Sequence, residues 1–411
     1  MPDLPRLALA DRVKILSGGG EPAFRPDRLP SKDAPMQPSP IRGLSRLSRR
    51  TLVAATAAGL VAAVAAPSRA AVAASRRFHT AGRVKAAADG FVRYSWPGIY
   101  FEARFRGTGV GILLDDSVND YDVQVDGRTT TTLVTPGRTT AWVTGLADTE
   151  HRVRLVKRTE SPGSEGRFGG FVAAAGGAIL ARPPARRRQI EFIGDSYTAG
   201  YGNLSGTRDC SGNGGVDRNT DSDLSFGALT ARRLGADYQI NAFSGRGMVR
   251  NYNGSSPGTD FRTYYDRALL GVEGDVWQKP ADWRPQVVVI GLGLNDFSTP
   301  LSPGERWGTE TELVAAYESA YHGFLDKLRA RYGPRTFLVV SATDLGSSPF
   351  AETVEGIART RNARGDERVG HWYYDDPALD HLGCDWHPSA RDHRLISGLL
   401  DDHLATLPLC C

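Results

Sequence analysis

The amino-acid sequence predicts two folded regions of different class: an all-β sandwich or jelly roll, then an α/β domain with helices on both faces of a parallel sheet. From about residue 78 to residue 180, short segments alternate apolar and polar residues, as half-buried strands require. After residue 189, short apolar segments instead alternate with helix-like stretches, which is typical of an α/β domain. Between the two patterns, residues 182–188 combine prolines with a run of arginines, which suits a domain boundary.

The first region contains several candidate strands and no helix-like stretch. In residues 99–106 the odd positions are apolar and the even positions mostly polar, and residues 122–127 repeat the alternation before an Asp-Gly turn signal. Since Gly, Pro and Asp separate the segments, we expect antiparallel pairing in a sandwich or jelly roll. The remaining strand candidates are residues 129–134, 140–143, 151–157 and 168–173.

The second region alternates apolar strand candidates with amphipathic helices. In the longest helix candidate, residues 310–332, six apolar or aromatic residues fall on one face at helical spacing. Strands that alternate with helices predict a parallel sheet covered on both sides. The expected strands are residues 190–193, 239–242, 287–291, 337–341 and 371–374, and the other expected helices are residues 226–234 and 390–404.

Residues 1–75 have the composition of an export signal rather than of a folded domain. Arg49 and Arg50 directly precede an apolar, Ala-rich run of about 15 residues, which is short for a bilayer span, and Ala71-Val72-Ala73 offers a cleavage site. These features resemble a twin-arginine signal. We therefore expect a secreted protein that begins near Ala74; the alternatives are an anchoring helix and a true start at Met36.

The charge of the chain is unevenly distributed. The formal net charge is +4, but residues 1–75 carry 11 basic against 5 acidic residues, which leaves 39 basic and 41 acidic residues in the rest. A folded part so close to neutral lacks the basic surface that binds a phosphate backbone, so nucleic acid is not an expected partner.

We expect three parts: the extension and signal at 1–75, the β domain at 76–183 and the α/β domain at 184–411.

Three short motifs follow strands, where ligands bind in such a sheet, and a fourth precedes the last helix. They are residues 194–198 (GDSYT), 244–247 (SGRG), 291–296 (GLGLND) and 383–389 (GCDWHPS). A serine on a tight turn presents a nucleophile, a histidine accepts its proton, and glycine-turn N–H groups with an Asn amide can bind an oxyanion. Together these groups predict acyl-transfer chemistry.

In this order, the four motifs match the SGNH superfamily of hydrolases, also called GDSL-type, at Ser196, Gly245, Asn295 and His387. With the β region placed before them, residues 78–411 resemble carbohydrate esterase family 2, the acetyl xylan esterase type. The resemblance implies a flavodoxin-like three-layer α/β/α catalytic domain that needs no metal or other cofactor. It also implies a serine esterase that removes O-acetyl groups from polysaccharides of xylan or glucomannan type.

The resemblance assigns a role to each motif. Ser196 is the expected nucleophile, and His387 the general base and later the acid. The N–H groups of Ser196 and Gly245, with the Asn295 amide, are expected to hold the oxyanion. Many members of the superfamily have an Asp three residues before the His; that position is Cys384 here, and Asp385 lies two before. On an extended segment the Asp385 carboxylate reaches the imidazole; alternatively a backbone carbonyl orients His387 and leaves a Ser–His dyad.

The four cysteines include one predicted pair. If Ser196 and His387 meet, the loops that hold Cys210 and Cys384 are drawn together, so we predict a disulfide at the rim of the site. The state of Cys410 and Cys411 stays open. None of the cysteines has C-x-x-C spacing, and the chain shows no standard zinc motif.

Aromatic residues beside the motifs are candidates for a sugar platform, because sugar C–H faces stack on aromatic rings. Trp307 and Trp386 are the two candidates, with core packing as the alternative, and Arg246 either contacts substrate or stabilises its loop. The expected partner is an acetylated polysaccharide or oligosaccharide, with no membrane contact in the mature form. The rival interpretations are a lipase or phospholipase of the same superfamily and a non-catalytic carbohydrate-binding protein.

Overall fold

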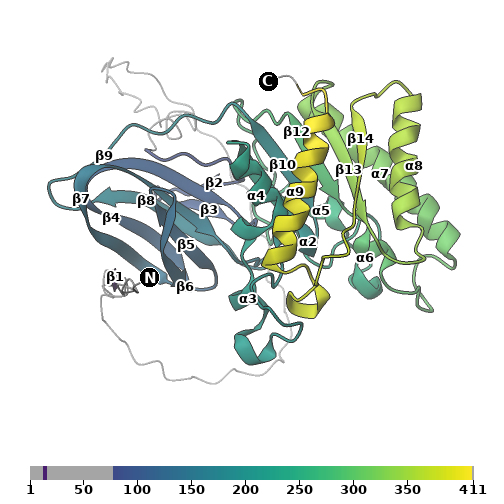
Figure 1. The fold of residues 1–411 in the computed structure, drawn as a ribbon, viewed down its shortest axis with the longest axis horizontal. Helices are drawn as coiled ribbons and strands as arrows, with labels where there is room; N and C mark the ends of the chain where they lie inside the picture. Colours follow the sequence, from purple (N-terminus) through teal and green to yellow (C-terminus); the bar gives the residue numbers. More distant parts are fainter. Residues whose placement is uncertain (1–12, 16–76, 410–411) are drawn as a thin grey trace, which may run out of the picture. The chain divides into compact units, whose positions relative to one another are not determined.

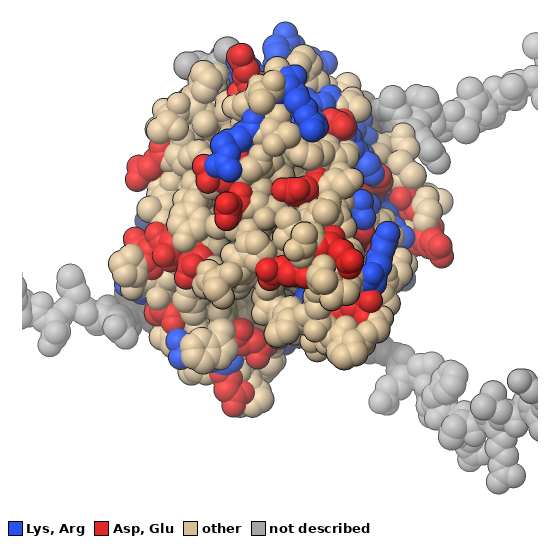
Figure 2. All heavy atoms as spheres, turned by 90° about the vertical axis from the view of Figure 1, so that its right-hand side faces the viewer, with Lys and Arg blue, Asp and Glu red and all other residues tan. Residues whose placement is uncertain are grey.

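The computed structural model describes residues 13–15 and 77–409 (Figure 1). The predicted signal and its cleavage site, Met36, Cys410 and Cys411 lie outside the described residues. Within those described ranges, no helix has the length and apolar character needed to cross a membrane. The regions on either side of residues 182–188 belong to one compact unit, and Figure 2 shows one face of it, on which acidic and basic side chains are interspersed.

The first region is a network of antiparallel strands, as the period of two predicts. Their order is β2-β3-β8-β4-β7-β5-β6, with β1 beside β7 and β9 beside β4. The strands are β1 (Val13–Ile15), β2 (Lys85–Ala86), β3 (Val92–Tyr94), β4 (Tyr100–Asp116), β5 (Asp120–Val125), β6 (Arg128–Val134), β7 (Gly137–Lys157), β8 (Gly166–Ala173) and β9 (Ala178–Ile179).

Two of these strands are longer than the sequence suggests. β4 continues past residue 106, and the separate strands expected at 140–143 and 151–157 are both part of β7. The pairing of β4 with β7 shifts register between Gly107 and Gly109. Such an irregularity lets long strands bend without ending, so polar residues at the bend interrupt the pattern but not the strand.

The second region is a parallel sheet of five strands in the order β11-β10-β12-β13-β14. Numbered from the start of this region, the order is 2-1-3-4-5, that of flavodoxin-like folds. The strands are β10 (Gln189–Gly194), β11 (Asp237–Ala242), β12 (Val287–Gly291), β13 (Phe337–Thr343) and β14 (Val369–Tyr374).

The helices of this region include the three that the sequence predicts, which correspond to α4, α7 and α9, and one long helix that it missed, α8. The α-helices are α2 (Ser196–Ala199), α3 (Gly215–Asn219), α4 (Phe226–Arg233), α5 (Phe261–Tyr265), α6 (Leu294–Phe297), α7 (Glu310–Tyr332), α8 (Phe350–Ala363) and α9 (Ala390–Thr406). The 3₁₀ turns are η1 (Ser211–Asn213), η2 (Ser222–Leu224), η3 (Tyr252–Gly254) and η4 (Cys384–Trp386).

Both faces of the parallel sheet are buried, which explains why its strands are continuous apolar runs. Along β12, Val288 and Ile290 pack in one core with α5, α7 and α8. Val287 and Val289 pack in the other core with α4 and α9. Figure 1 shows α9 crossing in front of the sheet. The loops that follow the strands therefore meet at one edge, where the four motifs lie.

The contacts between the two regions include buried polar ones, beside the apolar packing of Trp96, Tyr100 and Val156 in the cores of the α/β region. Arg154 of β7 donates to both carboxylate oxygens of Asp223 at 2.8 and 2.9 Å. The carboxylate of Asp237 in β11 accepts from the Tyr100 hydroxyl at 2.6 Å and contacts His79 Nε2 at 3.0 Å. Buried charges need paired partners, so these contacts fix the register of the β region against the α/β region.

Candidate active site

The first motif forms a tight turn from β10 into α2, with Ser196 as the first helical residue. The Asp195 carboxylate accepts from the Tyr197 N–H at 3.1 Å and caps the helix. A Cβ atom at Gly194 would lie 2.1 Å from the Thr198 hydroxyl oxygen, so only glycine fits the turn. The hydroxyl of Ser196 is thereby placed at the carboxyl edge of the sheet.

The imidazole of His387 lies against this hydroxyl, with Nε2 2.8 Å from Ser196 Oγ. The other ring nitrogen, Nδ1, is 2.9 Å from the carbonyl oxygen of Cys384 and 3.1 Å from that of Asp385. Since carbonyl oxygens only accept, Nδ1 carries the proton and Nε2 of the neutral ring is free to accept from Ser196. Burial lowers the pKa of His387, which favours this neutral form.

The expectation that the Asp385 carboxylate orients His387 is wrong in this structure. Residues 384–386 form the turn η4, in which Asp385 has a left-handed φ of 52°, so the segment is not extended and the i, i−2 argument fails. The carboxylate instead accepts from the Tyr201 hydroxyl at 2.8 Å. Backbone carbonyls hold the imidazole, which is the alternative that the sequence left open.

Two tyrosines enclose the imidazole, and the sequence gives no signal for one of them, Tyr201. The Tyr201 ring centroid lies 4.3 Å from that of His387, and the Tyr197 centroid lies 5.5 Å away. Burial and the bond to Asp385 raise the pKa of Tyr201, so its hydroxyl stays a donor. No pattern within the sequence marks Tyr201, because its contact with His387 joins residues 186 positions apart.

The other two motifs meet beside Asp195. The Asn295 side-chain amide donates to the Asp195 carboxylate at 3.1 Å and to the Arg246 carbonyl at 3.0 Å. Gly245 has a left-handed φ of 76°, which glycine adopts without strain. Among the described residues, no acceptor binds the N–H of Ser196 or of Gly245. These two donors are therefore available to a ligand.

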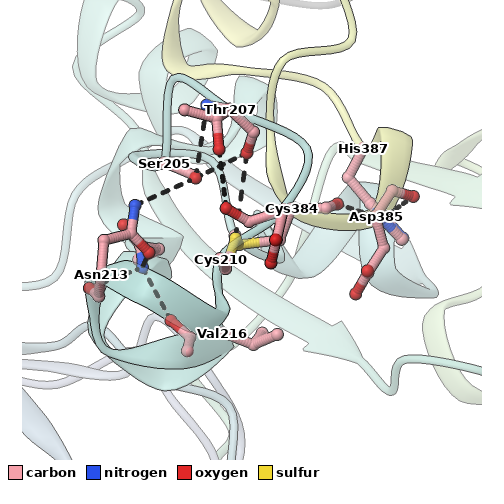
Figure 3. Close-up of a disulfide and its surroundings, with 12 residues drawn as sticks. Ser205, Thr207, Cys210, Asn213, Val216, Cys384, Asp385 and His387 are labelled. Carbon is pink, nitrogen blue, oxygen red and sulfur yellow. Dashed lines mark hydrogen bonds between the residues drawn. A yellow bond between two sulfur atoms is a disulfide. The ribbon is translucent and has the colours of Figure 1, made fainter.

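A disulfide joins Cys210 to Cys384, with the two Cα atoms 5.5 Å apart (Figure 3). It ties the loop before η1 to the turn η4, whose carbonyls contact His387. The N–H of Cys384 also donates to the Gly202 carbonyl at 3.1 Å, and a Cβ atom at Gly202 would lie 2.3 Å from Cys384 Cβ. The turn that positions the imidazole is thus fixed from two sides.

The candidate binding residues fall in different places. Trp386 is 65% exposed, and the guanidinium carbon of Arg208 lies 3.5 Å from the centroid of its ring, so core packing does not explain it. Trp307 lines a separate cavity with residues such as Arg262 and Phe324, and neither Ser196 nor His387 is among the residues that line it. Trp307 therefore does not share this cavity with the Ser–His pair.

In this structure the Arg246 side chain contacts nearby residues of its own segment. Its guanidinium donates to the Thr259 hydroxyl at 3.1 Å, and its central carbon lies 4.9 Å from the Phe243 ring centroid and 5.2 Å from that of Tyr264.

The described residues contain no group of three or more His, Cys, Asp or Glu side chains suited to hold a metal ion. The chemistry available at the site is that of a serine, an imidazole and hydrogen-bond donors.

Comparison with known proteins gives consistent matches over both regions. Residues 80–183 match the family described as carbohydrate esterase 2 N-terminal, and residues 190–396 match the GDSL-like lipase/acylhydrolase family. An acetylxylan esterase / glucomannan deacetylase of Cellvibrio japonicus is 41% identical over 311 residues, which cover 76% of this chain and 84% of that protein.

Solved structures show the same fold. One carbohydrate esterase, described as having divergent catalytic and non-catalytic binding functions at its active site, is 39% identical with a TM-score of 0.74, covering 81% of this chain and 98% of its own. A family two carbohydrate esterase from Clostridium thermocellum in complex with cellohexaose is 30% identical with a TM-score of 0.70, covering 80% of this chain and 98% of its own.

Proposed function

The chain belongs to carbohydrate esterase family 2, and on that basis we propose that it removes O-acetyl groups from a polysaccharide of xylan or glucomannan type through an acetyl-enzyme on Ser196. The observation that carries the proposal is the 2.8 Å contact between Ser196 Oγ and His387 Nε2. It supplies a nucleophile and a base within proton-transfer distance. The relative from Cellvibrio japonicus, which bears the name of both activities, supports the substrate class.

In the first half of the reaction, Ser196 Oγ attacks the acetyl carbonyl carbon while its proton passes to His387 Nε2. The carbonyl oxygens of Cys384 and Asp385 hold the Nδ1–H and stabilise the positive charge that the ring acquires. The free N–H groups of Ser196 and Gly245 bind the oxyanion. The Asn295 amide joins them by exchanging one of its two present acceptors, Asp195 or the Arg246 carbonyl, for the oxyanion. When the tetrahedral intermediate collapses, the bond to the sugar oxygen breaks, and this oxygen takes the proton from His387.

In the second half, water attacks the acetyl group on Ser196. His387 removes a proton from the water, a second tetrahedral intermediate forms, and its collapse breaks the bond to Ser196 Oγ. The serine oxygen regains the proton from His387, and acetate leaves. His387 is therefore base and acid once in each half, without any other titrating group.

We further propose that the exposed face of Trp386 forms the sugar platform. Arg208 covers one side of the indole, which leaves the other side for a sugar ring next to His387. The related esterase from Clostridium thermocellum was solved in complex with cellohexaose, and the rings of such a sugar chain present C–H faces that can stack on an indole. This assignment makes the polysaccharide, rather than a lipid chain, the group that sits beside the base.

The test is acetate release from acetylated xylan, glucomannan and cello-oligosaccharides by the wild type and the Ser196→Ala variant. We expect the variant to lose several orders of magnitude in kcat with its fold intact. A variant that keeps nearly the full rate contradicts the assignment. A preference for long-chain esters over p-nitrophenyl acetate would favour a lipase, and failure of a fluorophosphonate probe to label Ser196 would favour a non-catalytic binding protein.

Export and domain organisation are part of the same proposal. We propose that residues 1–75 direct the protein out of the cell by the twin-arginine route, that residues 76–183 form a jelly roll, and that residues 184–411 form the catalytic domain. Arg49-Arg50 before the apolar run, and a disulfide that an oxidising compartment would preserve, support export. N-terminal sequencing of protein recovered outside the cell should find a start near Ala74.

A further inference from the structure

A glutamate of the β region reaches into the loop that carries the oxyanion glycine. Glu160 follows β7, and its Oε1 accepts from the backbone N–H of Ser244 at 2.7 Å. Its Oε2 accepts from the hydroxyl of the same serine. One carboxylate thus binds both donors of the residue that directly precedes Gly245.

The segment that carries Glu160 is itself fixed by buried contacts. The ammonium group of Lys157, which is fully buried, donates to the Thr159 carbonyl at 2.7 Å and to the Ser95 carbonyl at 3.1 Å. The Thr159 hydroxyl donates to the Asn119 side chain at 2.8 Å. The β region therefore presents the carboxylate from a rigid support rather than from a freely moving side chain.

The loop that receives the carboxylate needs such a contact. It begins where the Phe243 N–H donates to the Gly194 carbonyl at 3.0 Å, and the Gly245 carbonyl accepts from the Tyr252 N–H at 2.9 Å. Within the described part of the chain, Glu160 is the partner of both Ser244 donors. Fixing Ser244 fixes the peptide that joins it to Gly245, and this peptide carries the free N–H.

We propose that Glu160 is a positioning residue for the esterase reaction: it holds Ser244 so that the Gly245 N–H is aimed at the oxyanion before substrate arrives. The inference rests on the proposed function of Ser196 and Gly245. A preorganised donor stabilises the charge that develops in the transition state more than it stabilises bound substrate. Loss of Glu160 should therefore lower kcat and leave KM nearly unchanged.

The negative charge of Glu160 is partly offset where it lies. Burial raises the pKa of Glu160, while the bonds from Ser244 and the charge of Lys157 act in the opposite direction. A glutamine can keep both contacts without the charge, because its carbonyl oxygen accepts from the Ser244 N–H and its amide donates to the Ser244 hydroxyl oxygen. Geometry and charge can thus be separated by substitution.

The experiment compares Glu160→Ala and Glu160→Gln in the full chain, with Glu165→Ala as the matched control. Glu165 lies in the same region, where it pairs with Arg93 at 2.6 Å, and it has no contact with Ser244. We expect Glu160→Ala to lower kcat on p-nitrophenyl acetate about 10- to 100-fold, less than the complete loss of an oxyanion donor. We expect Glu160→Gln to stay within about fivefold of the wild type and Glu165→Ala to match it.

A second readout makes the test independent of the natural substrate. The rate at which a fluorophosphonate labels Ser196 also depends on oxyanion binding, and it should fall in Glu160→Ala by a factor similar to that of kcat. Wild type that is labelled but releases no acetate from any polysaccharide would contradict the proposed function alone. Glu160→Ala with wild-type kcat and labelling rate, or an equal loss in Glu160→Gln, would overturn the positioning role.

Discussion

The Tyr201 hydroxyl donates to the Asp385 carboxylate at 2.8 Å, and the Tyr201 ring lies with its centroid 4.3 Å from that of His387. The carboxylate therefore contacts the ring that packs against the general base and not the imidazole itself, on which its negative charge acts without a hydrogen bond. It fixes the ring that packs against the imidazole, while the backbone of Cys384 and Asp385 fixes Nδ1. This arrangement separates the acidic side chain from the proton-transfer path.

The Asp385→Asn variant should consequently keep most of its activity. The asparagine carbonyl can accept from Tyr201 as the carboxylate does, so we expect kcat to fall less than about fivefold. In a Ser–His–Asp triad the same exchange lowers kcat by about 10⁴. Steady-state kinetics on p-nitrophenyl acetate distinguish the two cases, and a loss of roughly 10³ or more would show that Asp385 bonds the imidazole during turnover. Tyr201→Phe, which keeps the ring, is the matched control.

The acid limb of the pH profile should lie below the ordinary range of histidine. Burial lowers the pKa of His387, and the base acts only when neutral, so kcat/KM should rise with pH through a midpoint below about 6.5. Measurement of kcat/KM from weakly acidic to neutral pH on a substrate that does not titrate gives this midpoint. A midpoint clearly above the ordinary value would contradict the neutral, carbonyl-bonded imidazole described above.

Removal of the disulfide should affect both stability and rate. The Cys210→Ser, Cys384→Ser double variant opens a loop whose ends are 174 positions apart, and such a change costs about 2–4 kcal/mol of unfolding free energy. Since η4 carries both carbonyls that orient His387, kcat should fall as well. Urea denaturation and kinetics measure the two effects. The Cys410→Ser, Cys411→Ser variant is the control, and an unchanged kcat in the first variant would argue against coupling between the disulfide and the base.

Substitution of Trp386 and of Trp307 should have different effects on KM for an oligosaccharide. Trp386→Ala should raise KM for an acetylated oligosaccharide about 3- to 10-fold, the equivalent of one aromatic contact, and leave p-nitrophenyl acetate nearly unaffected. Trp307→Ala should change neither value, because Trp307 lines a cavity that does not include Ser196 or His387. The reverse result would move the sugar platform to Trp307.

The fold and the four motifs could be predicted because each depends on local pattern or chain order. Strand ends gather at one edge of a parallel sheet, which singles out the segments around Ser196 and Asn295. The roles predicted for Ser196, Asn295 and His387 follow from the resemblance to the SGNH superfamily. Helix α8, which was missed, could also have been predicted from the sequence. Phe350, Val354 and Ile357 are spaced at i, i+4 and i+7, and all three are buried.

Other features had no local signal. The positive φ of Asp385 reverses the direction in which its side chain points, and no residue type near it requires that conformation. The contacts of Tyr201 with His387 and of Glu160 with Ser244 join distant stretches of chain, so they follow from packing alone. The full length of β4 was missed for a different reason, because glycine weakens a strand and Gly107 interrupts the alternating pattern at the irregularity.

The Glu160–Ser244 bond crosses from one region of the protein to the other. The N-terminal region could be exchanged between members of the family at a junction in the arginine-rich segment 182–188. Such an exchange would replace Glu160 and keep Ser244. Chimaeras with a different side chain at position 160 would have a complete Ser–His pair, but the loop that carries Gly245 would lack the contact from Glu160. We therefore expect the two regions to work best when they are exchanged together.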